Sequence, residues 1–440
     1  MPISPKTWRW LALIGVVGIA AAVRCWRLDT AVLTHDEAFS WRLTQYPVGE
    51  LCVRTGQDVH PPVYYLVLKS WDRACGDSVW AMRGLSVVFG VAAVLLVYAL
   101  CFEALRQFAP PDGRPAVMRA GALMAALLVA LSSGQVDASR NARMYALGVL
   151  LAGASAWLLL RACRAGEGRW SWWAAYGVAA ALFCYTHNYA FFTLFGQALF
   201  VAALLLRRGQ TPSRSQIVCG FGYAALLAFI LYWPWLPVLL EQMRQVKENY
   251  WMAQPDTQIL EKTLFTWATG LVYEAELISR LWLALLALAV GFAMLGCPRP
   301  ALFFLLPALS PIALSTTLSL ASGRSIFHEH LFVFGQYFLI GLWAVVWAAL
   351  PGWLERAALA VVLVGVAASG LAVNLENRPP VAPPIVDAAQ YLKEAAQPGD
   401  ELWTGSPWEL NQWRYYLHQA GVSDIKVRCR HSFPGKGHMV

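Results

Sequence analysis

The sequence predicts an all-α, polytopic membrane protein with a small α/β appendage at its C-terminal side. The chain has 440 residues, of which 58% are hydrophobic and 14% charged, and its mean hydropathy is +0.49, too apolar for a soluble globular protein. Apolar runs of about twenty residues recur along it, and each is long enough to cross a hydrocarbon core of ~30 Å. Beyond residue 374 the composition becomes polar and proline-rich.

The apolar runs predict about eleven transmembrane helices. The first run could be mistaken for a signal peptide, but it lacks a small-residue cleavage site and many further spans follow, so we interpret it as a retained helix. The expected spans are 8–26, 80–102, 119–136, 143–161, 172–186, 189–206, 216–239, 280–296, 300–320, 330–350 and 353–373.

The arginines gather in alternate loops, and this pattern predicts the orientation. Cytoplasmic loops of membrane proteins carry an excess of Lys and Arg, so the arginine-rich loops 103–118 and 161–171 are expected in the cytoplasm. The N-terminus is then cytoplasmic, and an odd number of spans places the C-terminus on the opposite, periplasmic side of the membrane. The net charge of +8 fits this loop pattern better than a nucleic-acid partner, for which no aromatic-basic motif is found.

Two long loops, 27–79 and 240–279, fall on the periplasmic side. In the first, Pro61 and Pro62 are expected to start a short helix along the membrane surface, over 63–71. The second is polar enough to form a partly ordered lid. We expect a transmembrane domain over 1–373 and a periplasmic unit over 374–440, in which a proline-rich linker precedes helix, strand, helix and strand.

The segment THDEAFS (34–40) places two acids at the periplasmic surface. Thr34 and Glu37 have the spacing of a helix capping box, in which the two side chains bond each other's backbone amides. A cap requires only one acid, so Asp36 is left over. A carboxylate at the mouth of a helix bundle is a functional candidate.

Cations and histidines follow in other periplasmic segments. Arg140 and Arg143, in SRNARMYAL, precede a span; either they reach the membrane interface with their long side chains, or they bind phosphate through the planar guanidinium group. His187 lies in a short turn and is either a hydrogen-bonded structural residue or a substrate contact. A further polar cluster has spacing unsuited to zinc and comprises Arg324, His328, Glu329 and His330.

An acid, arginines and a hydrophobic bundle facing one side fit glycosyl transfer from a lipid phosphate. The acid would take a proton from the acceptor hydroxyl, and the arginines would neutralise the departing phosphate. The transition state of such a transfer resembles an oxocarbenium ion.

Five motifs, in this order, resemble the bacterial GT-C glycosyltransferases, the group of the dolichyl-phosphate-mannose protein mannosyltransferases and the lipid A aminoarabinose transferase. They are THDEAFSW, DVHPPVYYLVLKSW, ARMYAL, YTHNYAFF and LYWPWLPVLLEQ, and the resemblance runs from about residue 8 to 420. It implies a polyprenyl-phosphate sugar donor, inversion, no metal or other cofactor, and an acceptor that is a protein, a lipid or a polysaccharide.

The resemblance also implies roles for single residues. Asp36 would be the catalytic base with Glu37 beside it, and Arg143 and Tyr145 would lie near the donor phosphate. Further substrate contacts are implied for Asp58, His60 and His187.

Two departures from the family pattern concern arginines. A late Arg-Tyr pair is replaced here by Glu329-His330, so Arg324 is the candidate replacement for that phosphate contact. A Gln-Glu pair commonly precedes the arginine and tyrosine element, and here it is Arg140-Asn141.

Two alternative classes remain open at this point: a transporter or flippase, and an inactive scaffold with the same fold. A transporter predicts ionisable groups near mid-membrane, broken helices and internal repeats, none of which the sequence indicates. A disulfide between Cys52 and Cys75 also stays open.

Overall fold

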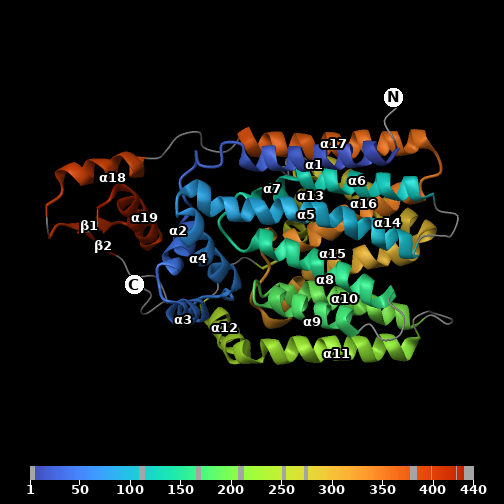
Figure 1. Ribbon diagram of the computed structural model, residues 1–440, viewed down its shortest axis with the longest axis horizontal. Coiled ribbons are helices and arrows are strands. Elements are labelled where there is room, and N and C mark those ends of the chain that lie inside the picture. The colour runs from blue at the N-terminus through green and yellow to red at the C-terminus, as the bar shows by residue number, and fades with distance from the viewer. Residues whose placement is uncertain are drawn as a thin grey trace.

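The computed structural model describes residues 5–108, 114–164, 170–206, 213–249, 254–271, 276–376, 384–397, 399–422 and 424–430. It consists of a bundle of long helices with a group of shorter elements at one end, which we call the cap (Figure 1). The predicted linker over 377–383 lies outside the described residues. The bundle helices are α1 (Pro5–Cys25), α5 (Val79–Phe108), α6 (Pro115–Leu131), α7 (Ser133–Ser139), α8 (Tyr145–Arg164), α9 (Trp170–Cys184), α10 (Ala190–Leu205), α11 (Arg214–Tyr232), α14 (Glu276–Gly296), α15 (Pro298–Ser322), α16 (Val333–Ala349) and α17 (Trp353–Glu376).

Every predicted span is mainly helical, although the span 119–136 is divided between α6 and α7 and the span 216–239 runs past the end of α11. The chain is a multi-pass membrane protein. Within the described ranges, eight helices are long and apolar enough to cross a membrane, and a ninth span results if α6 and α7 are counted as one bent span. The predicted spans 172–186 and 189–206 correspond to α9 and α10, which have only 15 and 16 residues. These two are shorter than the ~17–25 residues of a typical span.

Burial divides the bundle into central and peripheral helices. α16 lies at the centre, where Phe334, Tyr337 and Phe338 are fully buried. α14 instead exposes leucines such as Leu281 and Leu288 at 57% and 69% of their surface. Lipid is as apolar as a leucine side chain, so an apolar surface on a peripheral helix is stable in a bilayer.

The chain bends by 61° between α6 and α7, and this bend leads it into the site described below. Ser132 has extended backbone angles at the break. The last carbonyls of α6 therefore need other donors, and Arg24 from the end of α1 donates to Val129 and Ala130 at 3.0 Å each. The sequence predicted one straight span here, and no proline marks the break.

The cap combines the first long loop with the C-terminal segment. The loop forms α2 (His35–Thr44), α3 (Val48–Gln57) and α4 (Val63–Cys75), so the predicted surface helix is confirmed and lengthened. The C-terminal segment forms α18 (Pro384–Ala395), β1 (Glu401–Thr404), the 3-10 turn η3 (Pro407–Glu409), α19 (Leu410–Ala420) and β2 (Lys426–Cys429), the predicted order. β1 and β2 pair in parallel, with Glu401 opposite Lys426.

The two parts of the cap share one hydrophobic core. Leu33, Trp41 and Leu68 from the loop pack with Tyr415 and Tyr416 of α19. The remaining elements connect bundle helices and are η1 (Trp233–Trp235), α12 (Leu236–Asn249), α13 (Thr257–Thr269) and η2 (Glu329–Phe332). Cys52 and Cys75 are both free thiols, so no disulfide joins them.

Candidate active site

The two adjacent acids at the start of α2 have opposite environments. The Asp36 side chain is 57% exposed, whereas that of Glu37 is 1% exposed. The predicted capping box is present: the Thr34 hydroxyl accepts from the Glu37 amide, and Glu37 Oε2 accepts from the Thr34 amide at 2.9 Å. One acid caps the helix, and the other faces solvent.

Glu37 also forms a buried ion pair that the sequence did not predict. Its two oxygens accept from Arg83 Nε at 2.7 Å and Nη2 at 2.8 Å, and Oε1 also accepts from the Ala142 amide at 2.9 Å. Burial alone would raise the pKa of Glu37, but the hydrogen bonds and the charge of Arg83 outweigh it and hold this pKa below its usual value. Glu37 therefore ties together α2, α5 and the segment before α8.

Arg143 lies almost fully buried beside Asp36. Its Nη2 is 3.8 Å from Asp36 Oδ2, and its Nη1 donates to the Tyr65 hydroxyl at 3.0 Å. Burial would lower the pKa of this guanidinium, but the nearby oxygens of Tyr65 and Asp36 raise it above the usual value. Arg143 is thus a permanent positive charge, and its buried Nε has no hydrogen-bond partner among the described residues.

His60 extends this cluster on the other side of Arg143. Its Nδ1 lies 2.9 Å from Asp58 Oδ2, so we assign the ring proton to Nδ1, and Nε2 then faces Arg143 Nη2 at 3.4 Å as an acceptor. The backbone around it is fixed by Asn188, which donates to the Val59 carbonyl at 3.0 Å.

His187 is a buried histidine with one free donor. Its Nδ1 accepts from the Tyr189 amide at 3.0 Å, so Nε2 carries the proton, and Nε2 has no partner among the described residues. Its ring lies 6.1 Å from His60 and 6.0 Å from Tyr145. Burial, followed by the proximity of His60 and Arg143, holds the pKa of His187 well below its usual value, so the imidazole is neutral.

Two arginines that the sequence placed near the phosphate lie elsewhere. Arg140 ends α7 and donates to the carbonyls of Val23 at 2.9 Å and Arg27 at 3.2 Å, which joins α7 to the end of α1. Arg140 and Arg143 both precede α8, and the backbone between them is not helical. Arg324 is exposed, and no contact joins its side chain to the cluster.

Reasoning from the sequence missed two side chains of the cluster. Tyr65 lies within the DVHPPVYY motif, and its buried hydroxyl accepts from Arg143. Arg83 lies one turn inside the second span, where its only signal is a charge in an otherwise apolar helix. Such a charge usually pairs with another group, and here the partner is Glu37.

The C-terminal part of the cap contacts Leu33 and His35, two of the three residues that precede Asp36. Gln412 of α19 donates to the Leu33 carbonyl at 2.7 Å, and the Leu33 amide donates to the Tyr416 hydroxyl at 2.8 Å. The His35 ring packs edge-on against Trp408 with 4.7 Å between centroids. The start of α2 is therefore fixed from both sides, by α5 and by α19.

The cluster has the groups needed to take up a proton and to hold an anion. The exposed Asp36 carboxylate can accept a proton from a hydroxyl that arrives from solvent. Arg143 and His187 offer buried donors, Nε and Nε2, that no described residue satisfies, and buried donors are rarely left unpaired. Both donors are therefore available to a negatively charged group.

Comparisons with known proteins identify a matching family model and similar folds. Residues 59–236 match the family model described as dolichyl-phosphate-mannose-protein mannosyltransferase. No curated protein matches the chain. The matched segment contains His60, Arg143 and His187; it begins one residue after Asp58 and ends before the cap's C-terminal part.

Solved structures match over nearly the whole chain. ArnT from Cupriavidus metallidurans in the apo state has a TM-score of 0.63 at 13% identity, covering 94% of this chain and 85% of that one. The same protein bound to undecaprenyl phosphate gives a TM-score of 0.63 at 12% identity, covering 96% and 86%. The archaeal oligosaccharyltransferase AglB from Archaeoglobus fulgidus, in complex with an inhibitory peptide and a dolichol-phosphate, gives 0.53 at 12% identity, covering 96% and 64%.

These matches confirm the predicted resemblance at the level of the fold. The chain has the GT-C fold that it shares with ArnT and AglB, and its segment 59–236 matches the mannosyltransferase family.

Proposed function

We propose that the protein transfers a sugar from a polyprenyl-phosphate donor to an acceptor hydroxyl on the periplasmic face of the bacterial inner membrane, with inversion at the anomeric carbon. The observation that carries the proposal is the pairing of an exposed carboxylate with a buried cation: Asp36 Oδ2 lies 3.8 Å from Arg143 Nη2, and their side chains are 57% and 3% exposed. The exposed member is open to an acceptor, and the buried member suits a phosphate.

The chemistry assigns one role to each side of this pair. The acceptor oxygen attacks the anomeric carbon and its proton passes to Asp36, while the bond from that carbon to the phosphate oxygen breaks. Arg143 neutralises the charge that develops on the departing polyprenyl phosphate, whose low pKa makes a separate general acid unnecessary. His187 Nε2 and the Tyr145 hydroxyl are proposed as further donors to the same phosphate.

The comparisons support the donor class. One of the matched structures is bound to undecaprenyl phosphate and another to a dolichol-phosphate, both of them polyprenyl phosphates. The fold is similar to both, and this similarity is the reason for proposing a donor of the same chemical class here.

The test uses a strain that lacks the gene, complemented with wild-type protein or with Asp36→Asn at matched membrane levels. Mass spectrometry follows the polyprenyl-phosphate sugars and the glycosylated envelope products. We expect Asp36→Asn to lose a product and to accumulate a donor lipid, which also identifies the sugar.

Asp29→Asn is the matched control, because Asp29 is an exposed acid seven residues before Asp36 in the same loop. It should restore the wild-type profile. If Asp36→Asn restores that profile as well, Asp36 is structural and the proposed mechanism is wrong.

A further inference from the structure

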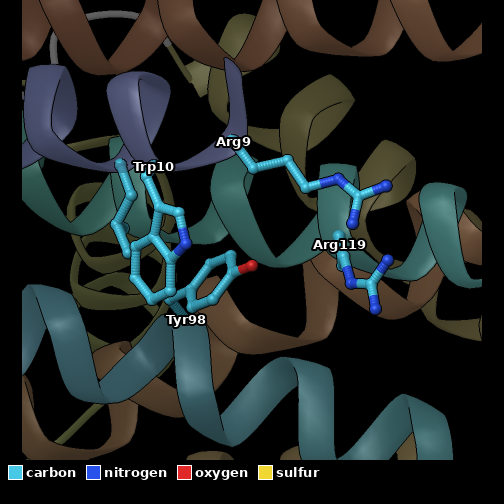
Figure 2. A pocket seen from close by; sticks show the side chains of 5 residues that line it. Arg9, Trp10, Tyr98 and Arg119 are labelled. Atoms are coloured by element: carbon cyan, nitrogen blue, oxygen red, sulfur yellow. The ribbon is translucent and has the colours of Figure 1, made fainter. Parts of the chain in front are cut away.

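A second basic site lies at the opposite end of the bundle from the candidate active site. It is a cavity of about 190 Å³ between α1, α5 and α6, lined by Arg9, Trp10, Leu13, Tyr98 and Arg119 (Figure 2). Along α1, Arg9 precedes Arg24, at the active-site end of this helix, by fifteen residues or roughly 22 Å of helix rise. This cavity and the site around Arg143 therefore cannot share one bound group.

The two arginines of this cavity differ from their neighbours because they have no acidic partner. Three other arginines at this end of the bundle share one carboxylate: Glu103 lies 2.9 Å from Arg106, 2.9 Å from Arg164 and 3.9 Å from Arg161. Among the described residues, no carboxylate lies within ion-pair distance of Arg9 or Arg119. The guanidinium of Arg119 lies over the Phe102 ring, 5.2 Å from its centroid, which restrains it without neutralising its charge.

The remaining lining residues give the cavity one polar and one apolar side. Figure 2 shows the indole nitrogen of Trp10 and the hydroxyl of Tyr98 turned toward the side on which both guanidinium groups lie. Leu13, which is buried, and the ring carbons of Trp10 give the cavity its apolar lining, and the Trp10 side chain is 66% exposed. The polar side thus offers hydrogen-bond donors to an anion, while the apolar side continues into the bilayer.

We propose that this cavity binds the phosphate of an anionic membrane lipid, with its acyl chains lying along Trp10 and Leu13. Basic pockets between transmembrane helices on the cytoplasmic side are suited to anionic headgroups, and the arginine-rich loops predict that this end of the bundle is cytoplasmic. Isolated arginines that merely reach the interface would each extend into solvent separately. Here two of them line one cavity together with two aromatic donors.

The proposal is tested by native mass spectrometry of the purified protein with defined lipids. The probes are phosphatidylglycerol, phosphatidylcholine and diacylglycerol of the same acyl chains, and inorganic phosphate. Wild-type protein should retain phosphatidylglycerol in preference to the other two lipids. Arg9→Gln combined with Arg119→Gln should weaken its binding roughly tenfold or more, because both cations next to the headgroup are lost.

The matched control is Arg106→Gln combined with Arg114→Gln, which removes the same charge from the same end of the bundle but leaves the cavity intact. It should change phosphatidylglycerol binding by less than about twofold, with unchanged thermal unfolding of all variants. Equal losses in both double variants would mean that general charge attraction holds the lipid, and the proposal would fail. Binding of inorganic phosphate without any preference among the lipids would overturn the lipid assignment in favour of a free anion.

Discussion

Arg143 and the pair formed by Arg9 and Arg119 lie at opposite ends of the same bundle and are held in different ways. Arg143 is 3% exposed, and Tyr65, His60 and Asp36 surround it. Arg9 and Arg119 line an open cavity, and no acid of the described chain lies beside them. One site is a preorganised network built from four segments of the chain, and the other is a cavity between three helices.

This difference teaches how a cation's role is inferred from its neighbours. A buried arginine whose orientation is fixed by other side chains suits catalysis, because its position does not have to change during the reaction. An arginine on a flexible stem at the membrane interface suits binding of a headgroup, which only requires charge and access. Changes at the first site should therefore affect turnover, and changes at the second should affect lipid binding.

The largest expected effect is on turnover, and it follows from changing Arg143 in the candidate active site. Arg143→Gln should lower turnover by about 10²–10³-fold, the loss typical when one preorganised donor to a developing charge is removed. Arg143→Lys should recover only part of this activity, because lysine keeps the charge but loses the planar fork. Product formation per membrane-bound protein measures both, and Arg9→Gln with Arg119→Gln should stay within about twofold of wild type. An Arg143→Gln variant with normal turnover would remove this residue from the site.

The second-largest expected effect is on stability, and it concerns the buried ion pair between Glu37 and Arg83 beside the candidate active site. Glu37→Gln or Arg83→Met should each lower the free energy of unfolding by about 3–5 kcal/mol, because a charge is left buried without its partner. Denaturant unfolding in detergent micelles measures this loss. The control is Glu50→Gln, which breaks the ion pair of Glu50 with Arg54, whose side chains are 43% and 35% exposed; it should cost less than about 1 kcal/mol. Equal costs for both changes would show that the Glu37 pair is as weak as a surface pair.

A smaller effect is the pH dependence that His187 contributes. The pKa of His187 is lowered in the folded protein, so the unfolded chain binds a proton at a higher pH than the folded protein does. The stability that is present above the unfolded pKa of about 6.5 is therefore lost as the pH falls toward the folded pKa. The free energy of unfolding should decrease between pH 7.5 and 5.5 by up to about 1.4 kcal/mol per pH unit, and His187→Asn should flatten this slope. His330→Asn, at an exposed histidine, should leave it unchanged. A slope that persists in His187→Asn would assign it to another group.

The smallest expected effect is that of the two cavity arginines on the stability of the folded protein. Arg9→Gln with Arg119→Gln should change the free energy of unfolding in lipid-free detergent by no more than about 0.5 kcal/mol, because neither residue has an acidic partner to lose. Adding phosphatidylglycerol should then raise the melting temperature of the wild type more than that of the double variant. A large loss without lipid would mean that the two arginines hold the helices together.

Much of the fold could be predicted, because each span is a local property of composition. The capping box at Thr34 and Glu37 and the helix after Pro62 are also local, and both were predicted correctly. The bend at Ser132 was not, because it depends on the donors that Arg24 brings from α1. α9 has 15 residues, the length of its predicted span 172–186, whereas α10 has 16 residues and is shorter than its predicted span 189–206.

The candidate site was predictable where a motif supplied the residues and not where packing chose the partners. Asp36, His60 and Arg143 were named from the sequence and lie together, and the roles proposed for them remain predictions. The ion pair between Arg83 and Glu37 joins residues 46 positions apart, and the hydrogen bond from Arg140 to the Val23 carbonyl joins residues 117 positions apart. No local pattern in the sequence specifies such pairs, since they depend on which helices pack side by side.

The contact between α19 and the start of α2 has a consequence for the order in which the protein is made. Leu33 and its hydrogen-bond partner Tyr416 are 383 residues apart. At ribosomal rates of about 5–20 residues per second, the ribosome needs roughly 20 to 80 s to make the second after the first. During that interval the segment before Asp36 is already outside the ribosome, but α19, which contacts it in the folded protein, has not yet been made. The start of α2 is therefore expected to reach its final arrangement only near the end of synthesis.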